Sequence, residues 1–210
     1  MQRKDIQAQR IKDYFMQAAK EILKGEGLGA VSVRNIADRA GYSYATLYNY
    51  FTDIKDLIFL CVTDFQKECA QQVERDAKDH EPGTDRINAI AVSYILYFIQ
   101  YPGVFELFFL ERPSDICSNA SKMEQIHGFL TRLCEKDWDW LIESQQIAPV
   151  HAHHLKDQLN YTVTGLLLFY LNRKQPEAFE DFMRTAELQI TSILQAAEPE
   201  TESSSGPIDI

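Results

Sequence analysis

The residues from Ser32 to Leu57 constrain the fold of this chain more than any other stretch. They read S-V-R-N-I-A-D-R-A-G-Y-S-Y-A-T-L-Y-N-Y-F-T-D-I-K-D-L. Ser32 and Ser43 can each cap the start of a helix, and Gly41 can supply a left-handed turn residue between the two helices. Two short helices joined by a tight turn are typical of a helix-turn-helix, which places its second helix in the major groove of DNA.

The second of these helices has one apolar and one polar face. Leu47 and Phe51, four residues apart, are expected to face inward. The residues turned outward are then Tyr44, Ala45, Tyr48 and Asn49. Asparagine can bond adenine in bidentate fashion, a small alanine permits close approach, and tyrosine hydroxyls donate to phosphate oxygens. The sequence therefore predicts a DNA-reading helix.

Helical periodicity continues through the chain, and no strand pattern interrupts it. Glycines at 25, 27 and 29 should end the first helix, and Asp53 should begin a long fourth one. Five later helices are expected. They cover residues 84–101, a short stretch that ends near residue 110, residues 119–144, and two segments that begin at Pro149 and at Pro176. The prediction is an all-α protein of about nine helices.

Charge is divided unevenly along the chain, whose net charge is −10. Residues 1–58 hold nine Lys and Arg against seven Asp and Glu, whereas residues 59–210 hold twelve against twenty-four. Positive potential, which attracts nucleic acid, is therefore expected beside the helix-turn-helix. No apolar run approaches the roughly 20 residues of a membrane span, and no apolar leader follows the N-terminus, so we expect a cytoplasmic protein without a membrane partner.

The segment resembles the N-terminal domain of the TetR family of transcriptional regulators. That domain reads as a hydroxyl residue, a short helix with I-A, then A-G, a hydrophobic residue, Ser, L-Y-x-(Tyr or His)-F, and a Leu six residues later. This chain supplies Ser32, Ile36-Ala37, Ala40-Gly41, Tyr42, Ser43, Leu47-Tyr48-Asn49-Tyr50-Phe51 and Leu57 in the same order. The resemblance implies a three-helix DNA-binding domain in residues 1–53 and a helical effector-binding and dimerisation domain in residues 54–197. Residues 198–210 have the composition of a disordered tail.

The resemblance also implies roles for individual residues. Tyr48 and Tyr50 are expected to contact phosphates, Ser32 to clamp the DNA backbone, and Tyr44 and Asn49 to face bases. Arg34 has an equal alternative as a solvated surface charge. The complete set of expected DNA-binding residues is Ser32, Arg34, Ser43, Tyr44, Ala45, Thr46, Tyr48, Asn49, Tyr50 and Lys55.

One departure from the family pattern concerns the start of the fourth helix. The family usually places a phosphate-gripping lysine three residues after the phenylalanine, where this chain has Ile54 followed by Lys55. Adjacent helical residues point about 100° apart, so Lys55 is not an automatic substitute. With Tyr44 also standing where the family often has lysine, we expect a shallower salt dependence of DNA binding.

The family resemblance implies a ligand cavity among the aromatic residues of the later helices. The residues expected to line it are Tyr94, Phe98, Phe105, Phe109, His127 and Tyr161. The alternative is that these aromatics simply form the core. A lining without an obvious inward Arg or Lys favours an uncharged or cationic, largely hydrophobic effector of unidentified structure.

Assembly and metal binding are the remaining predictions. A palindromic operator requires a two-fold dimer, and the last two helices are the expected homodimer interface, where Gly165 would allow close approach. His151, His153 and His154 are interpreted as surface histidines because no Glu or Cys is nearby. Four widely spaced cysteines are interpreted as free thiols, and no metal or cofactor is expected.

Three functions remain after these arguments. The first is a one-component regulator, most simply a repressor, that a small hydrophobic effector releases from double-stranded DNA. The second is a DNA-binding adaptor or nucleoid-associated protein that a protein partner controls. An enzyme is disfavoured, because the sequence holds no G-x-S-x-G, phosphate-binding glycine loop or H-E-x-x-H motif.

Overall fold

The computed structural model describes residues 3–112 and 120–197, with side chains from residues 5–112 and 124–197. Within these ranges the regular structure is entirely helical, as the sequence predicts. The α-helices are α1 (Arg3–Gly25), α2 (Val33–Ala40), α3 (Tyr44–Tyr48), α4 (Ile54–Ala77), α5 (Thr84–Gln100), α6 (Pro102–Phe109), α8 (Ala120–His127), α9 (Phe129–Leu133), α10 (Glu135–Glu143), α11 (Pro149–Arg173) and α12 (Phe179–Gln195), and one 3-10 helix, η1, spans Leu28–Ala30.

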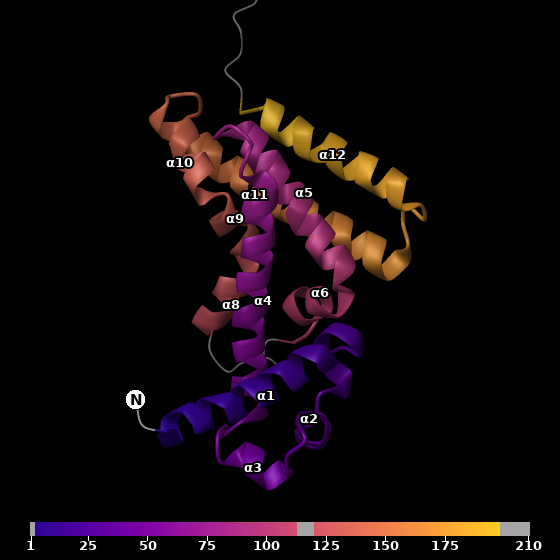
Figure 1. The fold of residues 1–210 in the computed structure, drawn as a ribbon. Coiled ribbons are helices and arrows are strands. Elements are labelled where there is room, and N and C mark those ends of the chain that lie inside the picture. Colours follow the sequence, from indigo (N-terminus) through magenta and orange to yellow (C-terminus); the bar gives the residue numbers. More distant parts are fainter. Residues whose placement is uncertain (1–2, 113–119, 198–210) are drawn as a thin grey trace, which may run out of the picture.

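The molecule has two parts joined by α4 (Figure 1). Helices α1, α2 and α3, here called the head, lie together at one end of α4. Helices α5 to α12, here called the body, gather around and beyond the other end, where α5 packs against α4, α11 and α12. The head also touches the body directly, because α1 packs against α6.

The body is built around α5, whose inward face is apolar. Ile87, Ile95 and Phe98 on this helix are completely buried. Proline cannot continue a helix, so α5 stops at Gln100 and Pro102 occupies the first turn of α6. The two helices turn by 105° at this break, which brings α6 down onto α1.

The segment predicted as one helix over residues 119–144 is instead three helices, α8 to α10, over the part that the structure describes. Gly128 separates α8 from α9, and Cys134 separates α9 from α10. Gly128 (φ −84°, ψ 15°) and Cys134 (φ −92°, ψ 0°) leave helical geometry in the same way, in a region open to non-glycine residues as well. The prediction of about nine helices is therefore low, since the described ranges contain eleven α-helices.

The last helix also begins later than predicted. Lys174 adopts a left-handed conformation (φ 53°) that ends α11, and α12 starts at Phe179 rather than at Pro176. On α12, Phe182 is completely buried and stacks on Tyr170, with ring centroids 4.1 Å apart, whereas Phe179 at the start of the helix is 42% exposed.

Three of the four cysteines lie in the described ranges and are free thiols within the core. Cys61 and Cys69 lie on α4, and Cys134 precedes α10. The Cys61 thiol points at the Met16 carbonyl oxygen of α1, 3.8 Å away, and burial raises the pKa of Cys61 to about 12. Cys117 and the tail from Glu198 lie outside the described residues.

None of the helices in the described part of the chain is by itself both long and apolar enough to cross a membrane. The bent pair α5–α6 reaches the required apolarity only when its two helices are taken together.

Candidate nucleic-acid interface

Side-chain caps define the helix-turn-helix of the head. The Ser32 hydroxyl accepts a hydrogen bond from the Asn35 backbone N–H (3.1 Å) at the start of α2. Gly41 ends α2 with a φ of 76°, a left-handed conformation that glycine adopts without strain. Ser43 then caps α3 by accepting from the Thr46 N–H (3.1 Å). The capping and turn residues predicted from the sequence are therefore confirmed.

The outward face of α3 is exposed as predicted. Tyr44 and Tyr48 are 66% and 56% exposed, and Ala45 and Asn49 are also exposed. Leu47, on the opposite face, is completely buried. An exposed aromatic pair next to an amide can donate hydrogen bonds to phosphates and bond a base edge, so this face has the chemistry that DNA reading requires.

Ser43 and Thr46 are held differently from their neighbours. Their hydroxyl oxygens lie 2.9 Å apart, so one donates to the other while Ser43 also caps the helix. Both hydroxyls thus stabilise the start of α3. The hydroxyl that accepts this bond keeps its own proton, which it can donate to a phosphate oxygen.

An aromatic cluster anchors α3 to α1. Phe51 meets Phe15 edge-on, with ring centroids 6.4 Å apart, and Tyr50 lies 6.4 Å from the same ring. Tyr42, from the turn between α2 and α3, packs on Phe15 at 5.4 Å. Tyr50 is therefore half-buried, unlike Tyr48, and only part of it faces solvent.

At the start of α4, Ile54 occupies the position where the TetR family usually has a lysine. Ile54 is partly buried and packs against the core, so the position that would carry a lysine is used for packing. Asp53 caps α4 by accepting from the Lys55 N–H (2.9 Å), and the Lys55 side chain is half-buried. Arg34 is almost fully solvated, with its nearest carboxylate, Asp38, 3.8 Å away.

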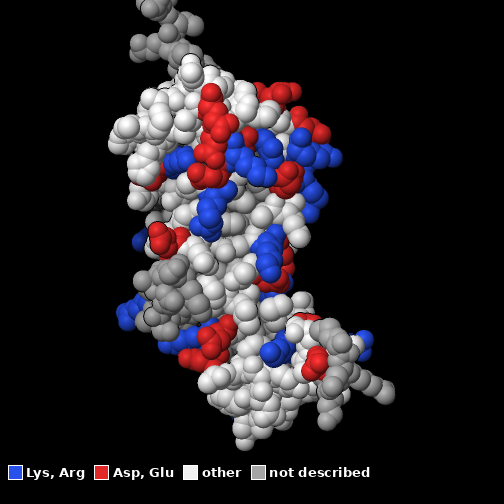
Figure 2. Space-filling view, turned by 90° about the vertical axis from the view of Figure 1, so that its left-hand side faces the viewer, with Lys and Arg blue, Asp and Glu red and all other residues white. Residues whose placement is uncertain are grey.

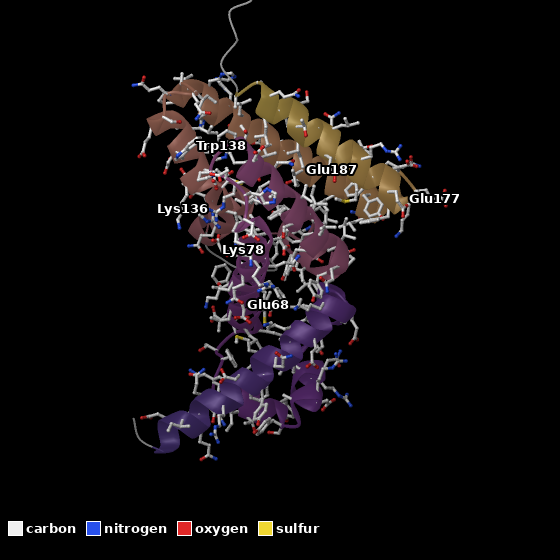
Figure 3. The ribbon with its side chains drawn as sticks, turned by 45° about the horizontal axis from the view of Figure 1, so that its top comes forward. Glu68, Lys78, Lys136, Trp138, Glu177 and Glu187 are labelled. Carbon is white, nitrogen blue, oxygen red and sulfur yellow. The ribbon has the colours of Figure 1, made fainter. Side chains whose placement is uncertain are left out.

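An ion network that sequence reasoning missed joins the head to α4. Lys20 of α1 lies between Asp64 and Glu68 of α4 and forms hydrogen-bonded ion pairs with both. Lys24 adds a 2.6 Å ion pair to Glu68, which lies where α4 meets α1 (Figure 3). Two lysines four residues apart, matched by two carboxylates four apart, were the available signal.

The electrostatics of this network favour the charged forms. Burial opposes the charge on Lys20, whose side chain is only 10% exposed, but its bonds to the two carboxylates outweigh burial and raise its pKa. Burial likewise opposes ionisation of Glu68, yet Lys20 and Lys24 together lower its pKa. The charges are therefore fixed at the junction of head and body.

Aromatic and backbone contacts complete the junction. Lys24 Nζ lies 4.3 Å from the centroid of the Tyr101 ring and 5.4 Å from that of Phe65, within cation–π range. Gly103 of α6 lies so close to α1 that a Cβ there would be 2.4 Å from the Leu23 carbonyl oxygen. A displacement of α4 or α6 would therefore shift α1 as well.

Four of the six predicted ligand residues come together in the body. Tyr94 and Phe98 meet with ring centroids 4.8 Å apart, and Phe98 is 5.8 Å from both Phe105 and Phe109. The first three are buried and Phe109 is half-buried. His127 and Tyr161 are exposed outside this cluster, Tyr161 by 72%.

The histidines of α11 lie on the surface. His151, His153 and His154 are exposed, and His153 is 3.8 Å from Asp157. Among the described side chains, no group of three or more His, Cys, Asp or Glu residues is placed to hold a metal ion.

Comparison with known proteins supports this geometry. Residues 15–61 match the family model for bacterial regulatory proteins of the tetR family. The match runs from the aromatic cluster around Phe15 into the first turns of α4. No curated protein matches the chain.

Solved structures share the whole fold. The regulator FadR from Bacillus subtilis, in complex with stearoyl-CoA, has a TM-score of 0.69 at 16% identity, over 86% of this chain and 96% of that one. A TetR family transcription regulator from Marinobacter aquaeolei has a TM-score of 0.64 at 18% identity, over 93% and 98%. A TetR variant from Acinetobacter baumannii, in complex with minocycline, has a TM-score of 0.61 at 15% identity, over 87% and 93%.

The sequence resemblance is thus confirmed over the helix-turn-helix by the family match and over the body by the shared fold. Residues 15–61 thus have the sequence of a tetR-family regulatory domain, and the described helices adopt the all-helical fold of TetR-family transcription regulators.

Proposed function

We propose that the protein is a one-component transcriptional repressor. In this proposal it binds a palindromic operator as a homodimer and is released by a small, largely hydrophobic effector. Residues 1–53 act as the DNA-binding domain, and residues 54–197 bind the effector and form the dimer. The observation that carries the proposal is the exposed face of α3, with Tyr44 and Tyr48 held outward by a capped and anchored helix.

The residues proposed to meet DNA fall into two groups. Tyr44 and Ala45 on α3, and Asn49 directly after it, are exposed and are assigned to base edges. Contacts to phosphates are assigned to Ser32, Arg34, Ser43, Thr46, Tyr48, Tyr50 and Lys55. Because Tyr50 and Lys55 are half-buried, we assign them a smaller share of the binding energy than Tyr48.

The dimer is proposed to form through α11 and α12. These helices expose large apolar side chains that would otherwise meet water, namely Tyr161 (72%), Leu168 (38%), Phe169 (59%), Phe179 (42%) and Leu188 (64%). Large apolar side chains exposed on two neighbouring helices are typical of a surface that a partner covers. In a symmetric dimer the two helices and their copies form a four-helix bundle.

The effector is proposed to enter the aromatic cluster around Phe98. Two proteins of similar fold hold stearoyl-CoA and minocycline in their structures, which supports a small-molecule effector here. The effector must bind the DNA-free conformation more tightly than the DNA-bound one, or it shifts nothing. Helix α4 and the Lys20 ion network then carry the change from body to head.

Selection from a random duplex DNA pool with the purified full chain tests the DNA-binding part. We expect enrichment of an inverted repeat. Tyr48→Phe should weaken binding to that repeat about tenfold by removing a charge-assisted bond to phosphate, and Asn49→Ala should relax base preference. Glu143→Gln, which alters an exposed residue at the end of α10, is the control. Failure to enrich any repeat would contradict the proposal.

Light scattering tests the dimer separately. Leu188→Glu should convert a dimer to a monomer, whereas Leu60→Glu, which alters a leucine of α4 that is 46% exposed, should leave the dimer intact. A wild-type monomer at micromolar concentration would contradict the assembly while leaving the DNA result standing.

A further inference from the structure

A hollow of about 540 Å³ opens on the side of the body between α4, α5, α9 and α10. It is separate from the aromatic cluster to which the hydrophobic effector is assigned. The residues that line it are Ala70, Gln71, Val73, Glu74, Arg75, Arg86, Arg132, Leu133, Lys136 and Asp137.

The charge of this hollow is opposite to that of the surrounding body. Its lining contains four bases, Arg75, Arg86, Arg132 and Lys136, against two acids. Residues 59–210 as a whole hold twice as many acids as bases. Figure 2, which faces this side of the molecule, shows Lys and Arg side chains gathered across the upper part of the body, with Asp and Glu between them.

Three of the four bases are without an ion-pair partner in the part of the chain that the structure describes. Among the described residues, no carboxylate lies within ion-pair distance of Arg75, Arg132 or Lys136. Arg132 is exposed, so a ligand can reach it, while partial desolvation of its guanidinium lowers its pKa. Its guanidinium donates to the Gln125 carbonyl oxygen, so it is positioned rather than free to swing away.

Arg86 supports the floor of the hollow. It pairs with Glu74 at 2.8 Å and stands 3.9 Å from Asp137, and its buried Nε has no hydrogen-bond acceptor among the described residues. Burial raises the pKa of Asp137, which accepts a hydrogen bond from the Gly83 backbone N–H and, with Glu74, supplies the two carboxylates of the lining. Positive charge therefore exceeds negative charge at this surface.

Arg132 also borders a second hollow of about 490 Å³, whose other lining residues are Gln66, Glu124 and Gln125. Arg132 is the residue common to the two linings. The bases come from four helices, which spreads them farther than one carboxylate can span.

We propose that the hollow lined by these four bases binds a small molecule carrying a phosphate chain, with two or more negative charges held by Arg132, Lys136 and Arg75. Guanidinium groups suit phosphate oxygens because of their fork of donors. DNA is a poorer occupant, because α3 lies at the opposite end of the molecule (Figure 1). A ligand here would tie α9 and α10 to α4, the helix that leads to the head.

Calorimetric titration of the full chain with inorganic pyrophosphate and with ADP tests the site. Wild type should bind pyrophosphate more tightly than orthophosphate, since orthophosphate meets fewer of the bases. Lys136→Gln should weaken pyrophosphate binding about threefold or more, and adding Arg132→Gln should weaken it by at least about thirtyfold in total. Figure 3 labels Lys136 on α10, together with Lys78, the matched control. Lys78 pairs loosely with Asp79 and lies outside the lining, so Lys78→Gln should stay within about twofold of wild type.

Several results would overturn the proposal. They are no binding of pyrophosphate to wild type at millimolar concentration, equal binding of orthophosphate, or equal weakening by Lys78→Gln and Lys136→Gln. If Arg132→Gln loses its helical circular dichroism, Lys136→Gln still decides, because Lys136 is exposed. The result is independent of the DNA selection, which tests the regulator proposal by itself.

Discussion

Replacing Lys20 by methionine removes the cation that joins the head to α4 while keeping a side chain of similar length. Asp64 then loses its ammonium partner, whereas Glu68 retains Lys24 at 2.6 Å. Removing one partner of a buried ion pair typically costs about 3–5 kcal/mol. Asp64 and Glu68 are 28% and 34% exposed, so water screens part of the loss. We therefore expect Lys20→Met to lower the free energy of unfolding by about 2 kcal/mol.

Urea unfolding followed by circular dichroism measures this loss of free energy. In thermal unfolding, the same loss should lower the Tm of the 210-residue chain by roughly 4–8 °C. Lys12→Met is the matched control, because Lys12 is an exposed lysine of the same helix and should change stability by less than about 0.5 kcal/mol. If both variants unfold at the wild-type midpoint, the network does not hold the head to α4 and the reasoning is refuted.

Three further predictions concern the same junction and its neighbourhood. Gly103→Ala should destabilise the protein by about 1–3 kcal/mol, because its Cβ would overlap the carbonyl oxygen of Leu23; a wild-type Tm would show that α6 can move away without cost. Glu68 has a lowered pKa in the folded state, so its stabilising contribution is complete above its ordinary pKa of 4.5 and is lost as pH falls through the lowered value. A Glu68→Gln variant should therefore lose less stability than wild type over that acid range. Parallel curves of unfolding free energy against pH for the two proteins would contradict this. Ile54→Lys should steepen the salt dependence of operator binding by about 0.9 in the log–log slope if the new lysine meets a phosphate; an unchanged slope would mean that it does not.

The head could be predicted closely because its signals are local. Ser32, Gly41, Ser43 and Asp53 each determine a cap or a turn within a few residues of themselves. The inward position of Leu47 likewise follows from helical spacing alone. Such features depend little on the rest of the chain, so composition and spacing were sufficient.

The body was predicted less well because its features depend on tertiary contacts. The break at Gly128 interrupts a pattern whose apolar spacing continues on both sides, so periodicity alone joined α8, α9 and α10 into one helix. Which aromatic residues meet a ligand stays a prediction, because the spacing along one helix does not determine how neighbouring helices pack against it. The ion network around Lys20 was missed because its partners lie more than forty residues away.

The burial of the thiols gives this molecule an internal reporter of its own motion. Alkylating reagents attack the thiolate, and Cys61 is fully covered, has a raised pKa and faces the Met16 carbonyl oxygen of α1. Its modification rate at neutral pH therefore depends on how often α1 separates from α4. Cys134, buried beside α10, counts openings of the body instead. Comparing the two rates by mass spectrometry would time the separation of head and body without any added label.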